Sequence, residues 1–599
     1  MIRIAIAQFR PRKAAYQANL DRIGELFGEL ARQEDRIDLL VLPETALTGY
    51  FVEGGVRELA VPAQQLFEDL AARHAAVGGP PLEVITGFYE LWNTRLYNAG
   101  LAVRLGGPEA GIRHVHRKIF LPTYGVFDEE RFVEPGRWVQ AFDTAWGRAA
   151  VVVCEDAWHS IVPMMAALDG AQLVIILSAS PARGIQPSEG AEGRPASTVR
   201  WERTAQAIAM EHGLFVAVAH LVGFEGGKGF PGGSVVVDPR GEVVFRAQIF
   251  DESMAVVELD LDQIVRARAD EPLLSDLETH LPHLLDGLTA RREGGRLPGP
   301  ADQVAARSVP FAPRSSAPRP PSPPGGGDDP LAIDPELTER WLVEFLREEV
   351  GRRRGFERVV LGLSGGVDSA VVAHLAARAF GPENVTAVRM PYRTSSAASL
   401  DHAQLVIDQL RLSSRTVDIS GGVDGLAASL GEVPTPSRLG NIMARMRMIT
   451  LFDLSAAIGA IPLGTGNKTE RLFGYFTWHA DDSPPVNPIG DLLKTQVWAL
   501  ARHLGVAEVI VGKPPTADLV AGQTDEGDFG ISYARADLIL HWTLSGFPQE
   551  AIERLGFPAA EIALVRRRLD STHWKRKLPT VAMVSPTAIG EFYLRPVDY

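Results

Sequence analysis

The sequence predicts an α/β protein, and three observations carry this prediction. The chain of 599 residues is too long for one hydrophobic core, and a hydrophobic content of 46% provides material for several packed domains. Short apolar runs that end in polar or charged residues occur in both halves and indicate buried strands. In the C-terminal half such runs alternate with helical stretches, a pattern typical of a doubly wound parallel sheet.

Composition narrows the classes of partner. A net charge of −14 argues against a nucleic-acid partner. With a single cysteine the chain forms no internal disulfide and no cysteine-based metal cluster. The chain begins with a strand-like alternation rather than a signal peptide, and no apolar stretch is long enough to span a bilayer. We therefore expect a cytoplasmic protein that binds small molecules, without a nucleic-acid or membrane partner.

One domain junction is plain from composition. Residues 308–330 consist mainly of proline, serine and glycine, so they cannot form a core. We expect one domain over 1–262 and a second over 335–599. Between them, 263–334 forms a polar extension and a linker.

A glycine-rich motif opens the second domain. The apolar run 359–362, a predicted strand, leads into Leu-Ser-Gly-Gly-Val-Asp-Ser at 363–369 and then into an apolar helical stretch. Glycines let the backbone approach an anion, and free N–H groups at a helix start point toward it. The motif lacks the Lys-Ser/Thr pair of a Walker loop, but Asp368 can hold magnesium on bound phosphates. The motif resembles the pyrophosphate-binding loop of the ATP pyrophosphatases.

Further stretches of the second domain strengthen this interpretation. The segment Gly-Thr-Gly-Asn-Lys-Thr-Glu at 464–470 follows a predicted strand and offers Glu470 as a second carboxylate for the metal. Together with RLGNIMARMRM, PIGDLLKTQVW and GQTDE, it makes the region 335–599 resemble the NAD synthetases. This resemblance implies an enzyme that adenylates the carboxylate of deamido-NAD with ATP and lets ammonia displace AMP.

The resemblance also implies roles for particular residues. Magnesium is expected at Asp368 and Glu470, and deamido-NAD at Arg445 and Lys575. The expected ATP contacts are Gly362, Leu363, Ser364, Gly365, Gly366, Val367, Asp368, Ser369, Thr465, Lys494 and Thr516. Two positions depart from the family pattern, because Trp478 stands where a lysine is usual and Trp574 where a histidine is common. Both tryptophans could stack on the acceptor nucleotide, or could simply pack within the fold.

The first domain has its own reactive set. Three apolar predicted strands each end beside one reactive group, namely Glu44, Lys118 and Cys154. A lone cysteine is usually a packed hydrophobe, but a base, a cation and a thiol together can attack an amide. In that chemistry Glu44 removes the thiol proton, Cys154 attacks the carbonyl carbon and Lys118 stabilises the oxyanion.

The region 1–262 resembles the nitrilase superfamily in these three contexts. The resemblance implies an α-β-β-α sandwich with a Glu-Lys-Cys triad, and Glu129 corresponds to a second active-site glutamate. It also implies glutamine contacts at Tyr124, Glu155 and Ser180. A lysine expected six residues past Ser180 is absent, and Arg183 is a candidate replacement.

The combination is similar to the layout of glutamine-dependent NAD synthetases. It implies an ATP-dependent carbon–nitrogen ligase that takes ammonia from glutamine, uses Mg²⁺ and forms a homo-oligomer. One alternative is a related ligase that acts on another carboxylate, such as nicotinate mononucleotide, or takes ammonia from another amide. Another is a binding or scaffold protein with decayed sites, but both sets of candidate catalytic and metal-binding residues are intact.

Overall fold

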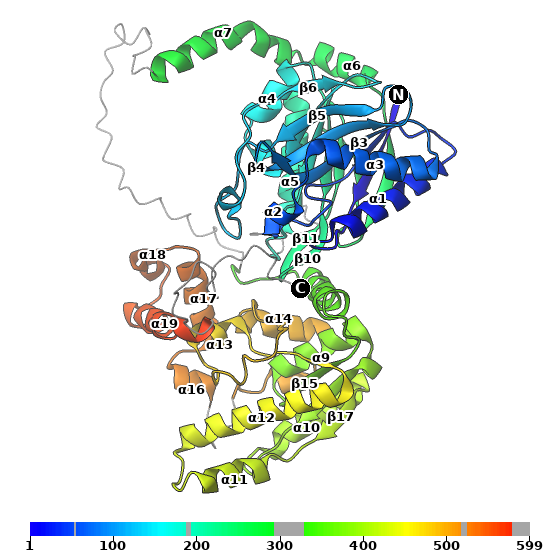
Figure 1. Ribbon diagram of the computed structural model, residues 1–599. Coiled ribbons are helices and arrows are strands. Elements are labelled where there is room, and N and C mark those ends of the chain that lie inside the picture. The colour runs from blue at the N-terminus through cyan, green and yellow to red at the C-terminus, as the bar shows by residue number, and fades with distance from the viewer. Residues whose placement is uncertain (53–54, 187–192, 293–328, 517–523, 578–599) are drawn as a thin grey trace, which may run out of the picture. The chain divides into compact units, whose positions relative to one another are not determined.

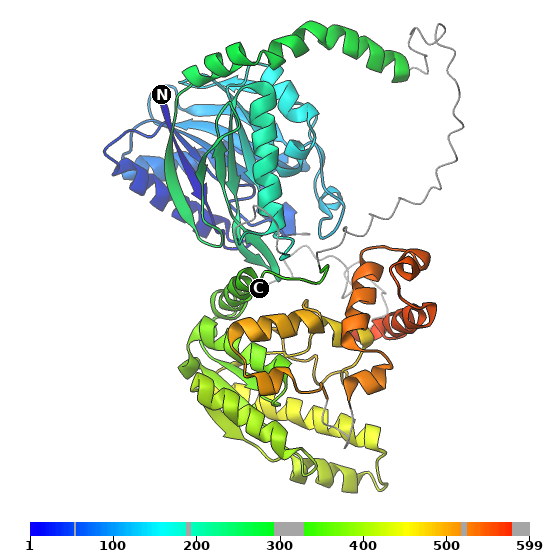
Figure 2. The ribbon, with the colours of Figure 1, turned by 180° about the vertical axis from the view of Figure 1, so that it is seen from behind.

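The computed structural model describes residues 1–52, 55–186, 193–292, 329–516 and 524–577. The described residues form two compact units. The first contains 1–184 and 194–292, and the second contains 329–577 with a few residues between 185 and 193. Figure 1 and, from behind, Figure 2 show the elements of each unit.

A six-stranded sheet in the first unit has the order β14-β1-β2-β3-β4-β5. Strands β1, β2 and β3 are parallel, whereas β14, β4 and β5 pair antiparallel to their neighbours. The strands are β1 (Ile2–Gln8), β2 (Leu39–Val41), β3 (Leu82–Trp92), β4 (Arg95–Leu105), β5 (Gly111–Arg117) and β14 (Ser253–Leu259). The predicted strands at the N-terminus and before Glu44 are thus confirmed.

The second sheet of this unit has the order β13-β12-β9-β8-β7-β6, with β7, β8 and β9 parallel. Its strands are β6 (Ala141–Asp143), β7 (Arg148–Val153), β8 (Leu173–Ser178), β9 (Phe215–His220), β12 (Val235–Val237) and β13 (Val243–Arg246). A separate hairpin consists of β10 (Val222–Glu225) and β11 (Lys228–Pro231).

The two sheets stack face to face with helices outside. Alternating residues of β1 and β8, such as Ile4 and Ile175, share one core between the sheets. Helices α1 (Tyr16–Ala31) and α3 (Ala63–Val77) cover the first sheet, and α4 (Ile161–Leu168) and α5 (Ala196–His212) cover the second. The expected α-β-β-α sandwich is confirmed. Shorter or later helices are α2 (Val56–Leu59), α6 (Asp262–Asp270) and α7 (Leu273–Arg292).

The second unit is built on a parallel sheet with the order β17-β16-β15-β18. Its strands are β15 (Val359–Gly362), β16 (Val385–Arg389), β17 (Ser413–Thr416) and β18 (Ile461–Pro462). One face of the sheet packs on α8 (Pro335–Leu346), α9 (Val367–Phe380), α10 (Ala397–Leu410) and α14 (Lys494–Leu504). The other face packs on α12 (Pro436–Ile458), so the predicted doubly wound sheet is confirmed.

The remaining helices of this unit flank the sheet. A second core, which includes Phe473, Phe529 and Ile562, joins α13 (Lys468–Phe473), α16 (Asp525–Phe529), α17 (Tyr533–Leu544), α18 (Gln549–Arg554) and α19 (Ala559–Ser571). Helices α11 (Ser420–Ser429) and α15 (Glu508–Val511) complete the set.

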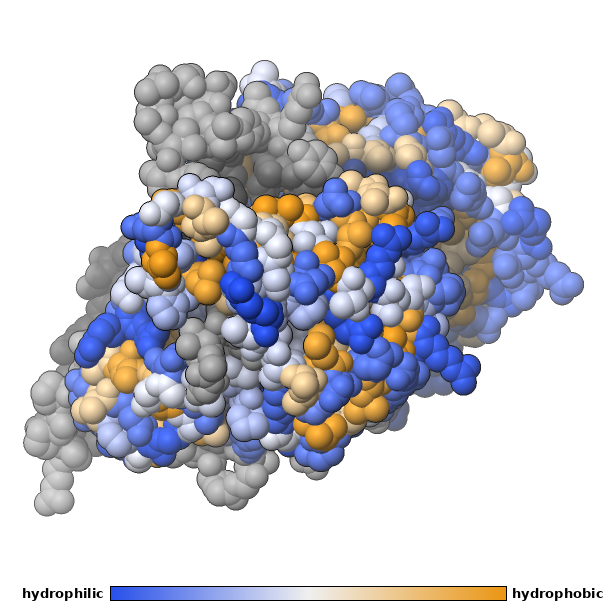
Figure 3. Space-filling view, turned by 90° about the horizontal axis from the view of Figure 1, so that it is seen from below, coloured by the Kyte–Doolittle hydropathy of each residue, from blue (hydrophilic) through white to orange (hydrophobic). Residues whose placement is uncertain are grey.

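On the face in Figure 3, hydrophobic and hydrophilic residues lie interspersed in small patches. Within the described ranges, no helix is both long enough and apolar enough to cross a membrane.

Candidate active sites

Lys118 is the centre of the first site. It follows β5 and is almost fully buried, with Nζ 2.9 Å from Glu44 Oε1 and 2.7 Å from Glu129 Oε2. Burial alone would favour the neutral amine, but the two carboxylates outweigh it and raise the pKa of Lys118 well above its ordinary value. The site therefore holds a charged ammonium in a water-poor environment.

Other donors fix the two carboxylates. Asn98, on β4, donates both side-chain N–H groups, one to Glu44 Oε1 at 2.7 Å and one to Glu129 Oε1. The backbone N–H of Ala179 donates to Glu44 Oε2 at 2.7 Å. Asn98 was not predicted from the sequence, although asparagine is depleted in strands and its presence within one was a usable signal.

Cys154 directly follows β7 and begins the short 3₁₀ helix η3 (Cys154–Trp158). Its φ of +45° is uncommon for a residue other than glycine and marks a sharp turn that presents the thiol. Sγ lies 3.7 Å from Ser178 Oγ. Burial and the nearby Glu44 raise the pKa of the thiol well above its ordinary value, so it needs a base to become a nucleophile.

Asp156 connects the segments that carry the cation and the thiol. Its Oδ1 accepts hydrogen bonds from two backbone N–H groups just after Lys118, both at 2.9 Å. Its Oδ2 lies 2.8 Å from Nε2 of the buried His116. Because Asp156 follows Cys154 by two residues, this carboxylate fixes the distance between thiol and ammonium. This role of Asp156 was not predicted from the sequence.

Of the residues expected to contact glutamine, Glu155 directly follows the thiol in sequence and Tyr124 contacts Glu155. The Tyr124 hydroxyl donates to Glu155 Oε2 at 2.8 Å, and burial with this hydrogen bond raises the pKa of Tyr124 to about 12. Ser180 is partly buried just beyond the end of β8. Arg183 is exposed and lies 5.9 Å above the ring of Phe127. Their roles toward glutamine stay predictions.

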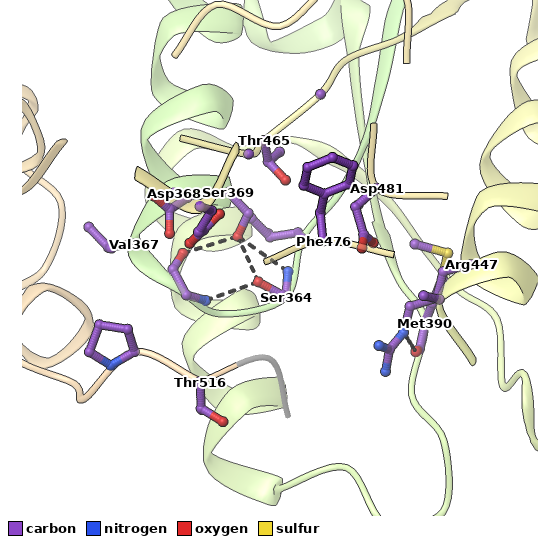
Figure 4. A pocket seen from close by; sticks show the side chains of 18 of the residues that line it. Ser364, Val367, Asp368, Ser369, Met390, Arg447, Thr465, Phe476, Asp481 and Thr516 are labelled. Atoms are coloured by element: carbon purple, nitrogen blue, oxygen red, sulfur yellow. Dashed lines mark hydrogen bonds between the residues drawn. The ribbon is translucent and has the colours of Figure 1, made fainter. Parts of the chain in front are cut away.

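The second site forms where the glycine-rich loop joins β15 to α9. Ser364 Oγ lies 3.1 Å from Ser369 Oγ, which donates to the Gly366 carbonyl at 3.0 Å, as Figure 4 shows. Gly365 has a φ of +76°, and a Cβ there would lie 2.1 Å from the Ser399 carbonyl oxygen. Glycine is therefore required at this position.

A pocket of about 330 Å³ opens at the carboxyl ends of the parallel strands, where doubly wound sheets bind ligands. Ten of the eleven expected ATP contacts line it, whereas Gly365 packs against Ser399 instead. The ten are Gly362, Leu363, Ser364, Gly366, Val367, Asp368, Ser369, Thr465, Lys494 and Thr516. Figure 4 shows several of them around the pocket, beside Phe476 and Arg447.

The two expected metal ligands are close to one lysine. Lys494 Nζ forms a short ion pair with Asp368 Oδ2 and lies 3.5 Å from Glu470 Oε1. Asn467 Nδ2, absent from the expected set, donates to Asp368 Oδ1 at 3.1 Å. Burial and the nearby Asp368 raise the pKa of Glu470 to about 8.

This carboxylate pair fits magnesium. Mg²⁺ is usually held by one or two carboxylates together with substrate phosphates. In the part of the chain that the structure describes, no group of three histidine, cysteine, aspartate or glutamate side chains could hold a metal ion. Asp368 and Glu470 would therefore need phosphate oxygens to complete the coordination.

The four residues expected to bind deamido-NAD form a cluster next to the pocket. Arg445 donates to the Trp478 carbonyl at 3.0 Å, and the rings of Trp478 and Trp574 meet edge to face at 5.2 Å. Lys575 donates to two backbone carbonyls just before Trp478, at 2.8 and 3.0 Å. These four described residues do not line the pocket itself, but Phe476 does. Their contact with a nucleotide stays a prediction.

Comparison with known families assigns each of the two units to a family. Residues 3–269 match the carbon-nitrogen hydrolase family and residues 339–579 match the NAD synthase family. The chain thus combines a carbon-nitrogen hydrolase unit and an NAD synthase unit.

Individual relatives extend this finding to the full length. A glutamine-dependent NAD(+) synthetase of Thermotoga maritima is 30% identical over 613 aligned positions, which cover 100% of this chain and 98% of that protein. This chain therefore belongs to the glutamine-dependent NAD(+) synthetase family. An NH(3)-dependent NAD(+) synthetase of Chlorobium phaeovibrioides is 48% identical over 263 residues, 43% of this chain and 94% of that one.

A solved structure supports the fold. The glutamine-dependent NAD+ synthetase of Acinetobacter baumannii, in complex with adenosine diphosphate, aligns with a TM-score of 0.69 and 22% identity. The alignment covers 100% of this chain and 98% of that chain.

Proposed function

We propose that this chain hydrolyses glutamine to glutamate and ammonia, and uses the ammonia to amidate ATP-adenylated deamido-NAD. The products are NAD, AMP, pyrophosphate and glutamate. The observation that carries the proposal is the presence of both sites in one chain: a buried Glu-Lys-Cys set and a glycine-rich loop beside paired carboxylates. Neither site alone performs the whole reaction.

The first site is equipped for amide hydrolysis. Glu44 takes the proton of the Cys154 thiol as sulfur attacks the amide carbon of glutamine, and Lys118 stabilises the oxyanion. Glu44 then gives the proton to the leaving ammonia, and afterwards activates the water that hydrolyses the thioester. Glu129 and Asn98 hold Lys118 and Glu44 in place for both steps.

The second site is equipped for adenylation. The backbone of the glycine loop, the Ser364 and Ser369 hydroxyls and the Lys494 ammonium would bind the phosphates of ATP. Magnesium on Asp368 and Glu470 would offset the negative charge that gathers at the phosphates. The acceptor carboxylate attacks the α-phosphate and expels pyrophosphate, and ammonia then displaces AMP.

Substrate selection depends on residues outside the two catalytic sets. Tyr124 and Glu155 suit the amino group of an amino-acid amide, and Arg183 suits its carboxylate. Trp478 and Trp574 suit a planar base or ring. No observation favours nicotinate mononucleotide as acceptor or another amide as donor, and the same assay tests both. The homo-oligomer and the cytoplasmic location stay predictions.

The test is AMP release by the full-length protein with deamido-NAD or nicotinate mononucleotide, and with glutamine or ammonium. We expect deamido-NAD to be preferred and both nitrogen sources to work. Cys154→Ala should abolish glutamine-driven synthesis and keep the ammonium-driven rate, because the synthetase site contains no thiol. Asp368→Asn should impair synthesis with either source and keep glutamate release.

Two results would contradict the proposal. One is loss of ammonium-driven synthesis in a folded Cys154→Ala variant. The other is a normal rate in Asp368→Asn at ordinary magnesium concentration. Absence of AMP release with every acceptor and donor would instead support a binding protein with decayed sites.

A further inference from the structure

Lys494 has an unusual place for a residue expected to bind ATP. It begins α14, is only 2% exposed, and lies 5.3 Å above the ring of Tyr533. A buried ammonium is costly unless it is paired. Lys494 meets this need with Asp368, on α9, and Glu470, on α13.

The two carboxylates also depend on the charge of Lys494. Asp368 and Glu470 both lie within 3.5 Å of the same nitrogen atom, so in their ionised forms the two side chains would repel each other without a cation. Asn467 occupies the second oxygen of Asp368 and is neutral. Lys494 is therefore the positive charge that lies between the two carboxylates and offsets their repulsion.

A divalent cation and the Lys494 ammonium compete for the position between Asp368 and Glu470. Mg²⁺ requires carboxylate oxygens at about 2.0–2.1 Å, so an ion between Asp368 and Glu470 needs the space that Nζ occupies. When the metal arrives with ATP, the displaced ammonium still lies in a pocket that would contain phosphate oxygens. The lysine then exchanges a carboxylate for a phosphate partner, and no charge is left unpaired.

We propose that Lys494 occupies the metal site between Asp368 and Glu470 until metal and nucleotide bind together, and then moves to the phosphates. The proposal rests on the proposed function, because it takes Asp368 and Glu470 as the ligands of the ATP-bound metal. It follows that metal alone binds weakly, and that metal and nucleotide each strengthen the binding of the other.

The probe is Mn²⁺, titrated into the full-length protein and followed by electron paramagnetic resonance, with and without a non-hydrolysable ATP analogue. The decisive variant is Lys494→Met, which frees the two carboxylates. We expect Mn²⁺ to bind this variant about tenfold or more tightly than the wild type in the absence of nucleotide. The added effect of the nucleotide analogue should shrink.

Two controls test whether the gain in Mn²⁺ affinity comes from the pair Asp368 and Glu470. Lys468→Met removes a similar charge nearby, because Lys468 pairs with the exposed Asp491 at 2.8 Å, and it should leave Mn²⁺ affinity unchanged. Adding Glu470→Gln to Lys494→Met should remove the gained affinity. Lys494→Gln serves the same purpose if the methionine variant does not fold.

The outcomes separate this proposal from the proposed function. Unchanged or weaker Mn²⁺ binding in folded Lys494→Met and Lys494→Gln overturns the exchange, even if the wild type makes NAD. Tight Mn²⁺ binding by the wild type without nucleotide also overturns it. A gain in Mn²⁺ affinity in a protein that makes no NAD would support the exchange and refute the proposed reaction.

Discussion

Lys118→Met separates the structural and catalytic roles of the buried ammonium. Methionine keeps most of the side-chain volume but leaves Glu44 and Glu129 facing one another without a cation. Removing one partner of a buried ion pair costs about 3–5 kcal/mol in the free energy of unfolding. Losing the group that stabilises the oxyanion should lower glutamine turnover roughly 10²- to 10³-fold. Ammonium-driven synthesis should change little, because its residues belong to the other unit.

Three measurements check this prediction: urea unfolding of the amidase unit, glutamate release, and AMP release with ammonium. The matched control adds Glu129→Gln, which removes one of the two stranded charges. It should recover part of the lost stability, on the order of 1–3 kcal/mol, without recovering glutamine turnover. The prediction is wrong if Lys118→Met keeps both the wild-type free energy of unfolding and the wild-type rate of glutamate release. It is also wrong if the double variant is no more stable to urea than Lys118→Met alone.

Two further predictions concern the acceptor cluster and acid stability. If Trp478 and Trp574 stack on the nucleotide, replacing either with alanine should raise KM for deamido-NAD roughly five- to hundredfold and leave KM for ATP nearly unchanged, since base stacking is worth about 1–3 kcal/mol. Lower thermal stability with unchanged KM in both variants would mean that they are packing residues. Burial lowers the pKa of His220 to about 3, so only the unfolded chain takes up a proton as pH falls below 6.5. Above pH 6.5 His220 is neutral in both the folded and the unfolded chain. Below pH 6.5 only the unfolded chain gains the proton, so the free energy of unfolding falls by about 3 kcal/mol by pH 4.5. His220→Gln should reduce the difference in unfolding free energy between pH 7 and pH 4.5, and an equal pH dependence in both proteins would argue against this explanation.

Local patterns were sufficient for much of the fold. The strand β15 was predicted with its observed bounds, because a short apolar run that ends at a glycine turn is typical of a buried strand. The strand β17 was not predicted. All four residues of β17, Ser413–Thr416, are exposed at the sheet edge, so apolar patterning could not identify it.

The residues that react or carry charge were predicted from the sequence. The residues that hold them in place through hydrogen bonds were not. Glu44, Lys118 and Cys154 each stand at a strand end and could be found by inspection. Asn98 and Asp156 act only through contacts with residues 31 to 54 positions away, and such contacts arise from the pairing of strands. The pairing of Lys494 with Asp368 spans 126 residues and has no local signal.

The raised pKa of the Cys154 thiol has a consequence for oxidative damage. Peroxide and similar oxidants react with thiolates far faster than with thiols, and burial limits access further. A cysteine that stays protonated until a substrate amide arrives is therefore sheltered between turnovers. Because this is the only sulfhydryl of the chain, oxidation of a thiol affects the supply of ammonia from glutamine and leaves the synthetase site without a damaged cysteine. A molecule with an oxidised Cys154 would then still carry out the ammonia-driven synthesis where ammonia is plentiful.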